Sequence, residues 1–505
     1  MAELILAHDT GTTGNKASLF DVQGRLLCSA FVGYQTHYPR PGWAEQSPQD
    51  WWQALCISTA QLLSESDCKA EDIAVVAFSG EMMSCLPIDA QGAPLRSAII
   101  WADQRADAEA GVLAERVGRE EIYRITGHRA GANYTAPKML WLRQHQPDIY
   151  ARTYRVLQAK DYLVYLLTGT YATDYSDASG TLLFDLAGRY WSKPILEALD
   201  IPIDLLPDAH PSAAVVGAIT RQAAQVTGLV EGTPVVIGGG DGGCATVGAG
   251  VVRPGDAYNY VGSSSWISFV SRDPLHDPQQ RTFTFAHLDP EYVFPTGTMQ
   301  CAGGSYDWLE RILRGTAEES LYRALDAAAS EVEPGAQGLL FLPYLIGERS
   351  PHWNPKARAA FVGLAMTHGR AEMARAVMEG VAFNLRLILD AFRDQGAAIT
   401  ALRLIGGGAR SHVWRQILAD VLNVPILRPK LLVEATSLGA AIAGGVGVGL
   451  YSDYTVADQL IAVEEGEEPA PAAVARYEEL YALFQASYQA LVPVYEGLAQ
   501  YQEKK

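Results

Sequence analysis

Two segments of the chain, about half its length apart, share one pattern of strand, short turn of glycine and hydroxyl residues, and strand. In the first segment the apolar run 4–7 leads into Asp9-Thr10-Gly11-Thr12-Thr13-Gly14, and a strand is predicted at 17–21. In the second, the predicted strand 257–261 leads into Gly262-Ser263-Ser264-Ser265. A unit that recurs in this way predicts an internal duplication, and therefore two similar domains.

Each of these turns offers several backbone N–H groups and hydroxyl donors on one side, an arrangement that suits phosphate oxygens. Asp9, which comes just before the first turn, could hold the Mg²⁺ that accompanies a nucleotide. The spacing of a Walker A loop is absent. One such unit alone is also consistent with a plain hairpin, whereas two of them, one per domain, would grip a polyphosphate from both sides.

A glycine-rich run, 238–243, follows the apolar residues 235–237 and contains a single charged residue, Asp241. The pattern predicts a buried strand that opens at its C-terminal end, where glycine lets the backbone approach a ligand closely. A carboxylate at this opening could take a proton from a substrate hydroxyl or help to hold a metal. The alternative is an aspartate that only caps a turn.

A third glycine-rich turn, 406–410, follows the predicted strand 402–405, and Ser411 is expected to cap the helix after it. A strand, glycine-rich turn and helix in this order leave free N–H groups at the helix start, which can meet a nucleotide. Glu434 to Ser437 are expected to cap another helix that begins at Leu438.

Polar and large side chains follow two further predicted strands, 73–79 and 98–100, as ligand-binding residues do in open α/β sheets. Met82 and Met83 come after the first strand, and Trp101 and Asp103 after the second. The alternatives are core filling for the methionines and a surface ion pair between Asp103 and its neighbour Arg105. The segments 160–162 and 174–177 add further polar groups, without a spacing that names a reaction.

Length and charge narrow the class of protein. A chain of 505 residues is too long for one core and predicts two or more domains, with a junction near 245–256. Lys and Arg number 39 against 57 Asp and Glu, a formal charge of −18, which argues against non-specific binding to nucleic acid or to an anionic membrane.

The six cysteines are scattered without a C-x-x-C pair, which favours a reducing compartment. The N-terminus lacks the basic and apolar regions of a signal peptide, and the apolar run 438–450 is too short for a membrane span. We therefore expect a cytoplasmic protein.

Three glycine-rich loops after strands, with acids at Asp9 and Asp241, suit a nucleotide held between two domains. This favours phosphoryl transfer, a reaction that needs positioning, a metal and a base rather than covalent catalysis. No Ser–His–Asp or haem motif competes with it. The rival class is a binding protein in which a nucleotide drives a change of shape.

Taken together, the motifs resemble the FGGY carbohydrate kinase family, and within it the xylulokinases. The segments that carry the resemblance extend from the N-terminus to about residue 445, and they are 9–14, 43–48, 51–52, 134–141, 238–241, 341–344, 347–349, 359–379, 406–411 and 414–416. The resemblance implies an α/β fold of two actin-like (ribonuclease H-like) domains in tandem, 1–248 and 249–505, with a catalytic cleft between them. It also implies a homodimer.

The resemblance further implies transfer of the γ-phosphoryl group of ATP to a terminal hydroxyl of a ketopentose, with D-xylulose preferred. Asp241 would be the general base, and Asp9 and Asp241 would hold Mg²⁺. The implied phosphate and nucleotide residues are Thr12, Thr13, Gly262, Ser263, Gly407, Gly408 and Ala409. The implied sugar contacts are Met82, Met83, Trp101, Asp103 and Asp241.

The sequence departs from the xylulokinase pattern at two positions. The usual Gly-Gln-Met-His is Gly80-Glu81-Met82-Met83, and the usual Asp-Asn is Asp241-Gly242. A histidine and an asparagine that would bond sugar hydroxyls are therefore missing. A site built to bond hydroxyls discriminates strongly among analogues, so another ketose or polyol stays open as the substrate: ribulose, erythritol, ribitol, glycerol or gluconate.

Overall fold

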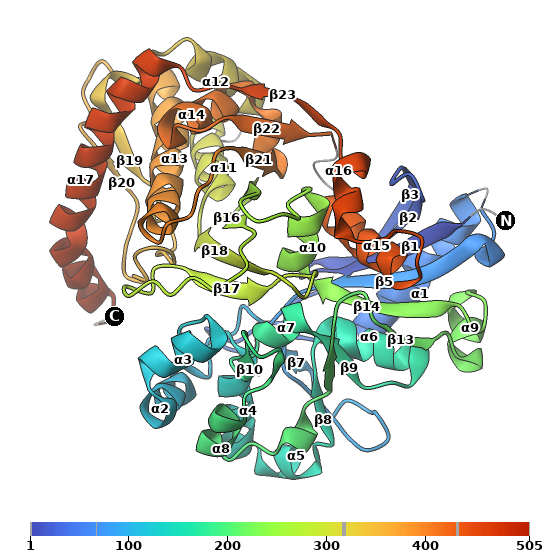
Figure 1. Cartoon of the computed structure of the whole chain (residues 1–505). Coiled ribbons are helices and arrows are strands. Elements are labelled where there is room, and N and C mark those ends of the chain that lie inside the picture. Colours follow the sequence, from blue (N-terminus) through green and yellow to red (C-terminus); the bar gives the residue numbers. More distant parts are fainter. Residues whose placement is uncertain (1–2, 67, 316–319, 431–433, 504–505) are drawn as a thin grey trace.

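The computed structural model describes residues 3–66, 68–315, 320–430 and 434–503, and each half of the chain is built on a mixed sheet (Figure 1). The strand order of the first sheet is β13-β14-β5-β1-β2-β3. Its strands are β1 (Leu4–Thr10), β2 (Gly14–Asp21), β3 (Leu26–Gly33), β5 (Ile73–Gly80), β13 (Val215–Ala218) and β14 (Pro234–Gly240).

The strand order of the second sheet is β17-β18-β16-β15-β21-β22-β23. Its strands are β15 (Ala257–Val261), β16 (Ser265–Phe269), β17 (Phe283–Ala286), β18 (Val293–Met299), β21 (Leu402–Ile405), β22 (Ile426–Pro429) and β23 (Val463–Glu467).

Both sheets contain the same arrangement of five strands, β3-β2-β1-β5-β14 in the first and β18-β16-β15-β21-β22 in the second. In each, the first three strands are antiparallel to their neighbours and the last two run parallel to the central strand. The predicted duplication is therefore confirmed strand by strand. The two predicted hairpin turns, 11–13 and 262–264, occupy equivalent places.

Helices cover the sheets largely where the sequence predicts them. Helix α1 (Pro48–Glu65) packs on β2 and β3 and is capped by Ser47, whose Oγ accepts the N–H of Asp50. In the second half, α13 (Arg370–Asp394) runs through the core against α14 (His412–Leu422). The long α17 (Pro471–Glu503) lies along the outside of this half, at the left of Figure 1.

A smaller group of elements, drawn in teal at the bottom of Figure 1, lies between β7 (Ala98–Ile99) and β13 in the sequence. It includes α2 (Asp107–Val117), α4 (Thr135–His145), α5 (Pro147–Arg152) and α8 (Lys193–Leu199). The predicted strand 98–100 is not a neighbour of β5 in the main sheet. A strand is present there, the two-residue β7, but it pairs with β4 (Glu45–Gln46) in a separate small sheet, so its expected place next to the strand 73–79 was wrong.

Two helices cross in close contact between the sheets, α10 (Asp241–Gly248) and α15 (Ala435–Gly447) (Figure 1). A Cβ atom on Gly439 would lie 1.9 Å from the carbonyl oxygen of Cys244, and one on Gly248 would lie 1.7 Å from that of Ala435. The absence of side chains at these positions is what lets the two backbones meet.

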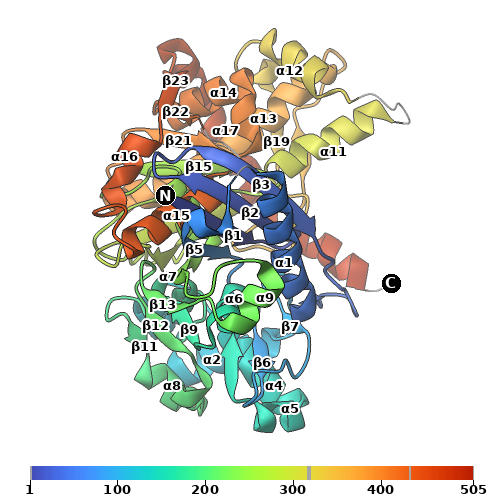
Figure 2. The same cartoon turned by 90° about the vertical axis from the view of Figure 1, so that its right-hand side faces the viewer.

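Helix α15 also packs on β1, β5 and β14, so the second half of the chain contributes to the core of the first sheet (Figure 2). The helix starts at Ala435 rather than at the predicted Leu438, and its N-cap residue, Glu434, makes no side-chain capping bond. Among the described residues, no helix combines the length and the apolar character that crossing a bilayer requires.

We predict that Gly439→Ala lowers the free energy of unfolding by at least about 2 kcal/mol, because the added methyl group meets backbone atoms of α10. Chemical denaturation of both proteins measures the change. Gly497→Ala is the matched control. Gly497 lies exposed in α17 with nothing within 4 Å of an added Cβ, so the same substitution there should stabilise by about 0.5–1 kcal/mol. Equal effects at the two sites would contradict the proposed close contact.

His287, which follows β17, links the second sheet to the segment after α10, and its protonation is expected to make the stability of the protein depend on pH. Its Nδ1 accepts the N–H of Asp289 and its Nε2 faces the carbonyl oxygen of Val251 at 3.3 Å. Burial lowers its pKa to about 4. Below pH 6.5 the unfolded chain binds a proton here that the folded chain does not, so this histidine's contribution to stability is lost as the pH falls toward 4.

The difference in unfolding free energy between the wild type and His287→Gln should therefore shrink by about 1.4 kcal/mol per pH unit below 6.5, and stay constant above pH 7.5. Denaturation of both proteins at pH 8, 6.5 and 5.5 gives this difference. A gap that does not change with pH would mean that His287 has the same pKa in the folded and in the unfolded protein.

Candidate active site

The C-terminal ends of three neighbouring parallel strands, β1, β5 and β14, lie level with one another. Thr10 on β1 is paired with Gly80 on β5, and Gly80 is paired with Gly240 on β14. The residues that follow Gly80 and Gly240 are Glu81 and Asp241, so two carboxylates extend from the same edge of the sheet. Asp9 lies one residue back on β1, paired with Ser79 of β5.

The glycine run at the end of β14 is needed for contacts within the protein. Gly238 has a φ of +67°, and a Cβ atom there would lie 1.8 Å from the carbonyl oxygen of Phe78. A Cβ on Gly240 would lie 2.6 Å from Sδ of Met82. The glycines thus let β14 and Met82 approach each other closely, and they bring the predicted sugar residue Met82 next to the backbone that carries Asp241.

Asp241 is the first residue of α10, and its Oδ1 accepts the N–H of Gly242 at 2.7 Å. Its side chain is open to solvent, yet the surrounding protein and the negative charge of Asp9 together raise its pKa to about 7. Tyr258 of β15 donates to the carbonyl oxygen of Gly242 at 3.3 Å. The second sheet therefore reaches the first turn of the helix that carries Asp241.

Asp9 is half-buried, and burial raises its pKa against the opposing effects of Ser79 and Lys16. With Asp241 it supplies two carboxylates, the hard oxygen donors that Mg²⁺ prefers. Within the described parts of the chain, no group of three or more His, Cys, Asp or Glu side chains could hold a metal alone. This donor set fits an ion that takes its other ligands from phosphate and water.

Glu81 is a third carboxylate at this edge of the sheet, and it is not among the site residues predicted from the sequence. It is 1% exposed, its Oε1 accepts the hydroxyl of Ser84 at 3.2 Å, and its Oε2 has no hydrogen-bond partner. Burial raises its pKa to about 7, with a smaller rise from Asp241 and an opposing bond to Thr12. The signal that could have found it is its position directly after β5, equivalent to that of Asp241 after β14.

The first hairpin turn contacts the predicted sugar side. Trp101, 41% exposed, donates its Nε1–H to Oγ1 of Thr12 at 2.9 Å. Gln46 donates to the carbonyl oxygen of Thr12 at 2.8 Å, and Thr13 is exposed at the tip of the turn. Thr12 and Trp101, predicted for phosphate and sugar respectively, are thus in direct contact.

Met83 is buried and has a φ of +68°, a conformation that is strained for a residue with a side chain. Three partners hold it there: its N–H donates to Oε1 of Gln158 at 2.5 Å, its carbonyl oxygen accepts from Nζ of Lys138 at 2.8 Å, and Nδ2 of Asn133 approaches its sulfur at 3.2 Å. Strained backbone of this kind is typical of binding sites.

Asp103 differs from its predicted surroundings. It is fully buried, and its carboxylate accepts the N–H of Ala44 at 2.6 Å and four bonds from the backbone and guanidinium of Arg105 at 2.7–3.0 Å. The ion pair with Arg105 is therefore a buried one. In this conformation Asp103 offers no free oxygen to a sugar, and it holds the turn that follows Trp101.

The predicted nucleotide residues lie at the ends of β15 and β21, which run side by side. Ser263 is exposed and Gly262 half-buried, and a Cβ on Gly408 would lie 2.4 Å from Cγ1 of Val261, so the two turns touch. Gly407 is exposed and Gly408 half-buried.

Ala409 is fully buried, and its carbonyl oxygen accepts from Nη1 of Arg415 at 2.7 Å. Its side chain therefore lies in the core, and of the predicted nucleotide residues in these turns Gly407 and Ser263 are the exposed ones.

Comparison with known proteins gives the family. Residues 4–248 match the N-terminal domain of the FGGY family of carbohydrate kinases, and residues 257–448 match its C-terminal domain. A relative from Escherichia coli (strain K12), a xylulose kinase, is 34% identical over 97% of this chain and 100% of its own length.

Among solved structures, a xylulose kinase from Rhodospirillum rubrum is similar with a TM-score of 0.90 and 32% identity, and covers 98% of this chain and 100% of its own. A gluconate kinase from Lactobacillus acidophilus is similar with a TM-score of 0.92 and 28% identity, and covers 99% and 100%. Both family models and these near-complete matches agree with the fold of two duplicated sheets. The chain belongs to the FGGY family of carbohydrate kinases, which are phosphotransferases.

Proposed function

We propose that this carbohydrate kinase transfers the γ-phosphoryl group of ATP to the terminal hydroxyl of a ketopentose, D-xylulose, and forms D-xylulose 5-phosphate. The observation that carries the proposal is the level alignment of β1, β5 and β14, which brings Asp9 and Asp241 to one edge beside the second sheet. The near-complete similarity to xylulose kinases supports the choice of sugar.

In this proposal Asp241 takes the proton of the attacking sugar hydroxyl. A carboxylate whose pKa is raised to about 7 is a far better proton acceptor near neutral pH than an ordinary aspartate, and about half of it is ionised at pH 7. Met82 packs against the backbone just before Asp241, and we expect it to form the floor of the sugar site with Met83.

Asp9 and Asp241 would hold Mg²⁺, which when bound neutralises negative charge on the phosphates. Thr12 and Thr13 of the first turn and Gly262 and Ser263 of the second would contact the phosphates from opposite sides. Gly407 and Gly408 would lie against the nucleoside. Trp101 bonds Thr12, so the phosphate turn and the sugar side can respond to each other.

Gluconate is the second candidate substrate, because a gluconate kinase has one of the most similar folds and the sugar site lacks two expected hydroxyl partners. At these positions the chain has the thioether of Met83 and the bare backbone of Gly242. An apolar group in place of a hydrogen-bonding one changes which hydroxyl configuration binds best.

We predict that Asp241→Asn lowers kcat by about 10³-fold, because amide cannot accept the hydroxyl proton, while the KM for ATP stays within about twofold. ADP release, coupled to a spectroscopic readout with Mg-ATP, is measured for D-xylulose, D-ribulose, ribitol, erythritol, glycerol and gluconate. D-xylulose should give the highest kcat/KM of this panel.

Asp148→Asn is the control, since Asp148 is an exposed residue of α5, in the smaller group of elements between β7 and β13. It should leave turnover unchanged. If gluconate gave the highest kcat/KM, the substrate would be gluconate rather than D-xylulose, and the assignment as a kinase would stand. Sugar-independent ATP hydrolysis that persists in Asp241→Asn would overturn the role of Asp241.

A further inference from the structure

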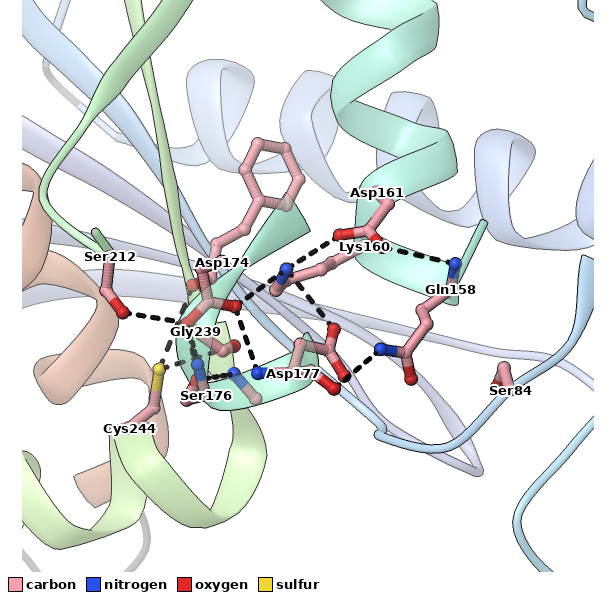
Figure 3. Close-up of polar contacts among 12 residues, drawn as sticks. Ser84, Gln158, Lys160, Asp161, Asp174, Ser176, Asp177, Ser212, Gly239 and Cys244 are labelled. Atoms are coloured by element: carbon pink, nitrogen blue, oxygen red, sulfur yellow. Dashed lines mark hydrogen bonds and ion pairs between the residues drawn. The ribbon is translucent and has the colours of Figure 1, made fainter. Parts of the chain in front are cut away.

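A buried group of four charged side chains lies behind the candidate site. The ammonium group of Lys160 is 2.7 Å from Oδ1 of Asp161, 3.0 Å from Oδ1 of Asp174 and 3.2 Å from Oδ2 of Asp177 (Figure 3). All four side chains are at most 1% exposed. They come from α6 (Ala159–Thr168), β9 (Ala172–Asp174) and α7 (Tyr175–Ser179).

Burial disfavours the charge of Lys160, yet the three aspartates hold its pKa well above the ordinary lysine value. Burying so many charges costs free energy that their mutual attraction only partly returns, and such a cluster is weak evidence for stability alone. The contacts at its borders indicate what else it does.

One border contact reaches the strand end that carries Asp241. Asp174 accepts the hydroxyl of Ser176 at 2.5 Å, and Oγ of Ser176 in turn accepts the N–H of Gly240 at 2.9 Å. A serine hydroxyl has one proton, which goes to Asp174, so its oxygen is left with lone pairs that face the amide. The residue after Gly240 is Asp241. A fixed line of bonds therefore runs from Lys160 through Asp174 and Ser176 to the backbone of the proposed base.

A second border contact reaches Met83. Gln158 accepts the Met83 N–H through Oε1 and donates through Nε2 to the carbonyl oxygen of Asp177 at 2.9 Å. Its own N–H is accepted by Oδ2 of Asp161 at 3.2 Å, which fixes Gln158 to the same cluster (Figure 3). Lys160 itself packs under the start of this loop, since a Cβ on Gly80 would lie 2.8 Å from its Cβ. The strained backbone of Met83 is thus held from the same buried group as Gly240.

We propose that Ser176 and Gln158 are positioning residues through which the Lys160–Asp161–Asp174–Asp177 cluster fixes two loops of the active site, Ser176 the one that carries the base and Gln158 the one that carries Met83. This proposal rests on the roles given above to Asp241 and Met83. The two residues have different roles in the proposal. Loss of the Ser176 hydroxyl would displace the proton acceptor Asp241, and loss of the Gln158 amide would release the loop that carries Met83.

Ser212 provides a matched control inside the same cluster. Its hydroxyl donates to the same oxygen of Asp174, at 2.8 Å, and it is equally buried. Among the described residues, its side chain bonds to neither loop, in contrast to that of Ser176. Ser212→Ala and Ser176→Ala each remove one hydroxyl from one carboxylate, and they differ in whether a catalytic loop is released.

The experiment compares steady-state kinetics of full-length Ser176→Ala, Gln158→Met and Ser212→Ala with the sugar that the wild type uses best. We expect Ser176→Ala to lower kcat at least tenfold with the sugar KM within twofold, because small displacements of a reacting group are costly. Gln158→Met should raise the sugar KM at least fivefold and change kcat by less than threefold. Ser212→Ala should change neither parameter by more than twofold.

Equal losses in Ser176→Ala and Ser212→Ala, or the same split of kcat and KM in Ser176→Ala and Gln158→Met, would overturn the proposal, since both results indicate a general loss of structure. Thermal unfolding of all three variants identifies the temperature at which each is fully folded for the assay.

Hydrogen exchange at the Gly240 amide tests the tether without any reference to turnover. We expect at least tenfold faster exchange in Ser176→Ala and wild-type exchange in Ser212→Ala. Unchanged exchange in Ser176→Ala overturns the proposal. If Asp241→Asn keeps its activity, the proposed function fails, while the exchange experiment still decides whether Ser176 holds the loop.

Discussion

Close approach of backbone to backbone is the constraint on which this structure depends. Glycines without space for a side chain occur where β14 meets β5, where α10 crosses α15, and where the turn after β21 touches β15. At Gly238, Gly439 and Gly408 an added Cβ would lie within 2.4 Å of a neighbouring atom. Each contact involves an element that carries or leads into candidate site residues, so the same small residues that allow the fold also help to set the spacing of the site.

Negative charge is concentrated where these close contacts converge. Asp9, Glu81 and Asp241 all have raised pKa values, mainly because the surrounding protein disfavours their charged forms, although the side chain of Asp241 itself is open to solvent. A carboxylate that is poorly solvated is a stronger proton acceptor and a better ligand for a cation than one at the surface. The raised pKa values thus suit the reaction proposed here, and β15 of the second sheet reaches α10 through the bond from Tyr258 to the carbonyl oxygen of Gly242.

Local signals in the sequence predicted much of this arrangement. Both hairpins, the cap at Ser47 and the cap at Ser411 follow from residues that lie within a few positions of one another. Predictions failed where the decisive contact comes from elsewhere in the chain. Ala98 and Ile99 resemble a strand of the main sheet but pair with Glu45 and Gln46.

Roles that depend on tertiary contacts could not be derived from spacing. Lys160 and Asp174 are fourteen positions apart with no recognisable motif between them, and only the fold brings their side chains to 3.0 Å. Glu81 was visible as a departure from the family pattern, but its contact with Thr12 and its nearness to Asp241 depend on the register of three strands. The motifs therefore predict the residues that extend from the edge of the sheet. They do not predict buried residues such as Lys160 and Asp174, whose contacts fix the position of those at the edge.

The position of Asp241 at the first turn of α10 has a mechanical consequence. Helix α10 leads directly from the first sheet into the second and is held against α15, so a rotation of one sheet relative to the other about this connection would have its axis near α10. Points near an axis move least when two bodies rotate about it. A rotation about such an axis that carried distant elements such as α17 through many ångströms would leave Asp241 almost in place, and of the two phosphate turns only the one at 262–264 would move toward it.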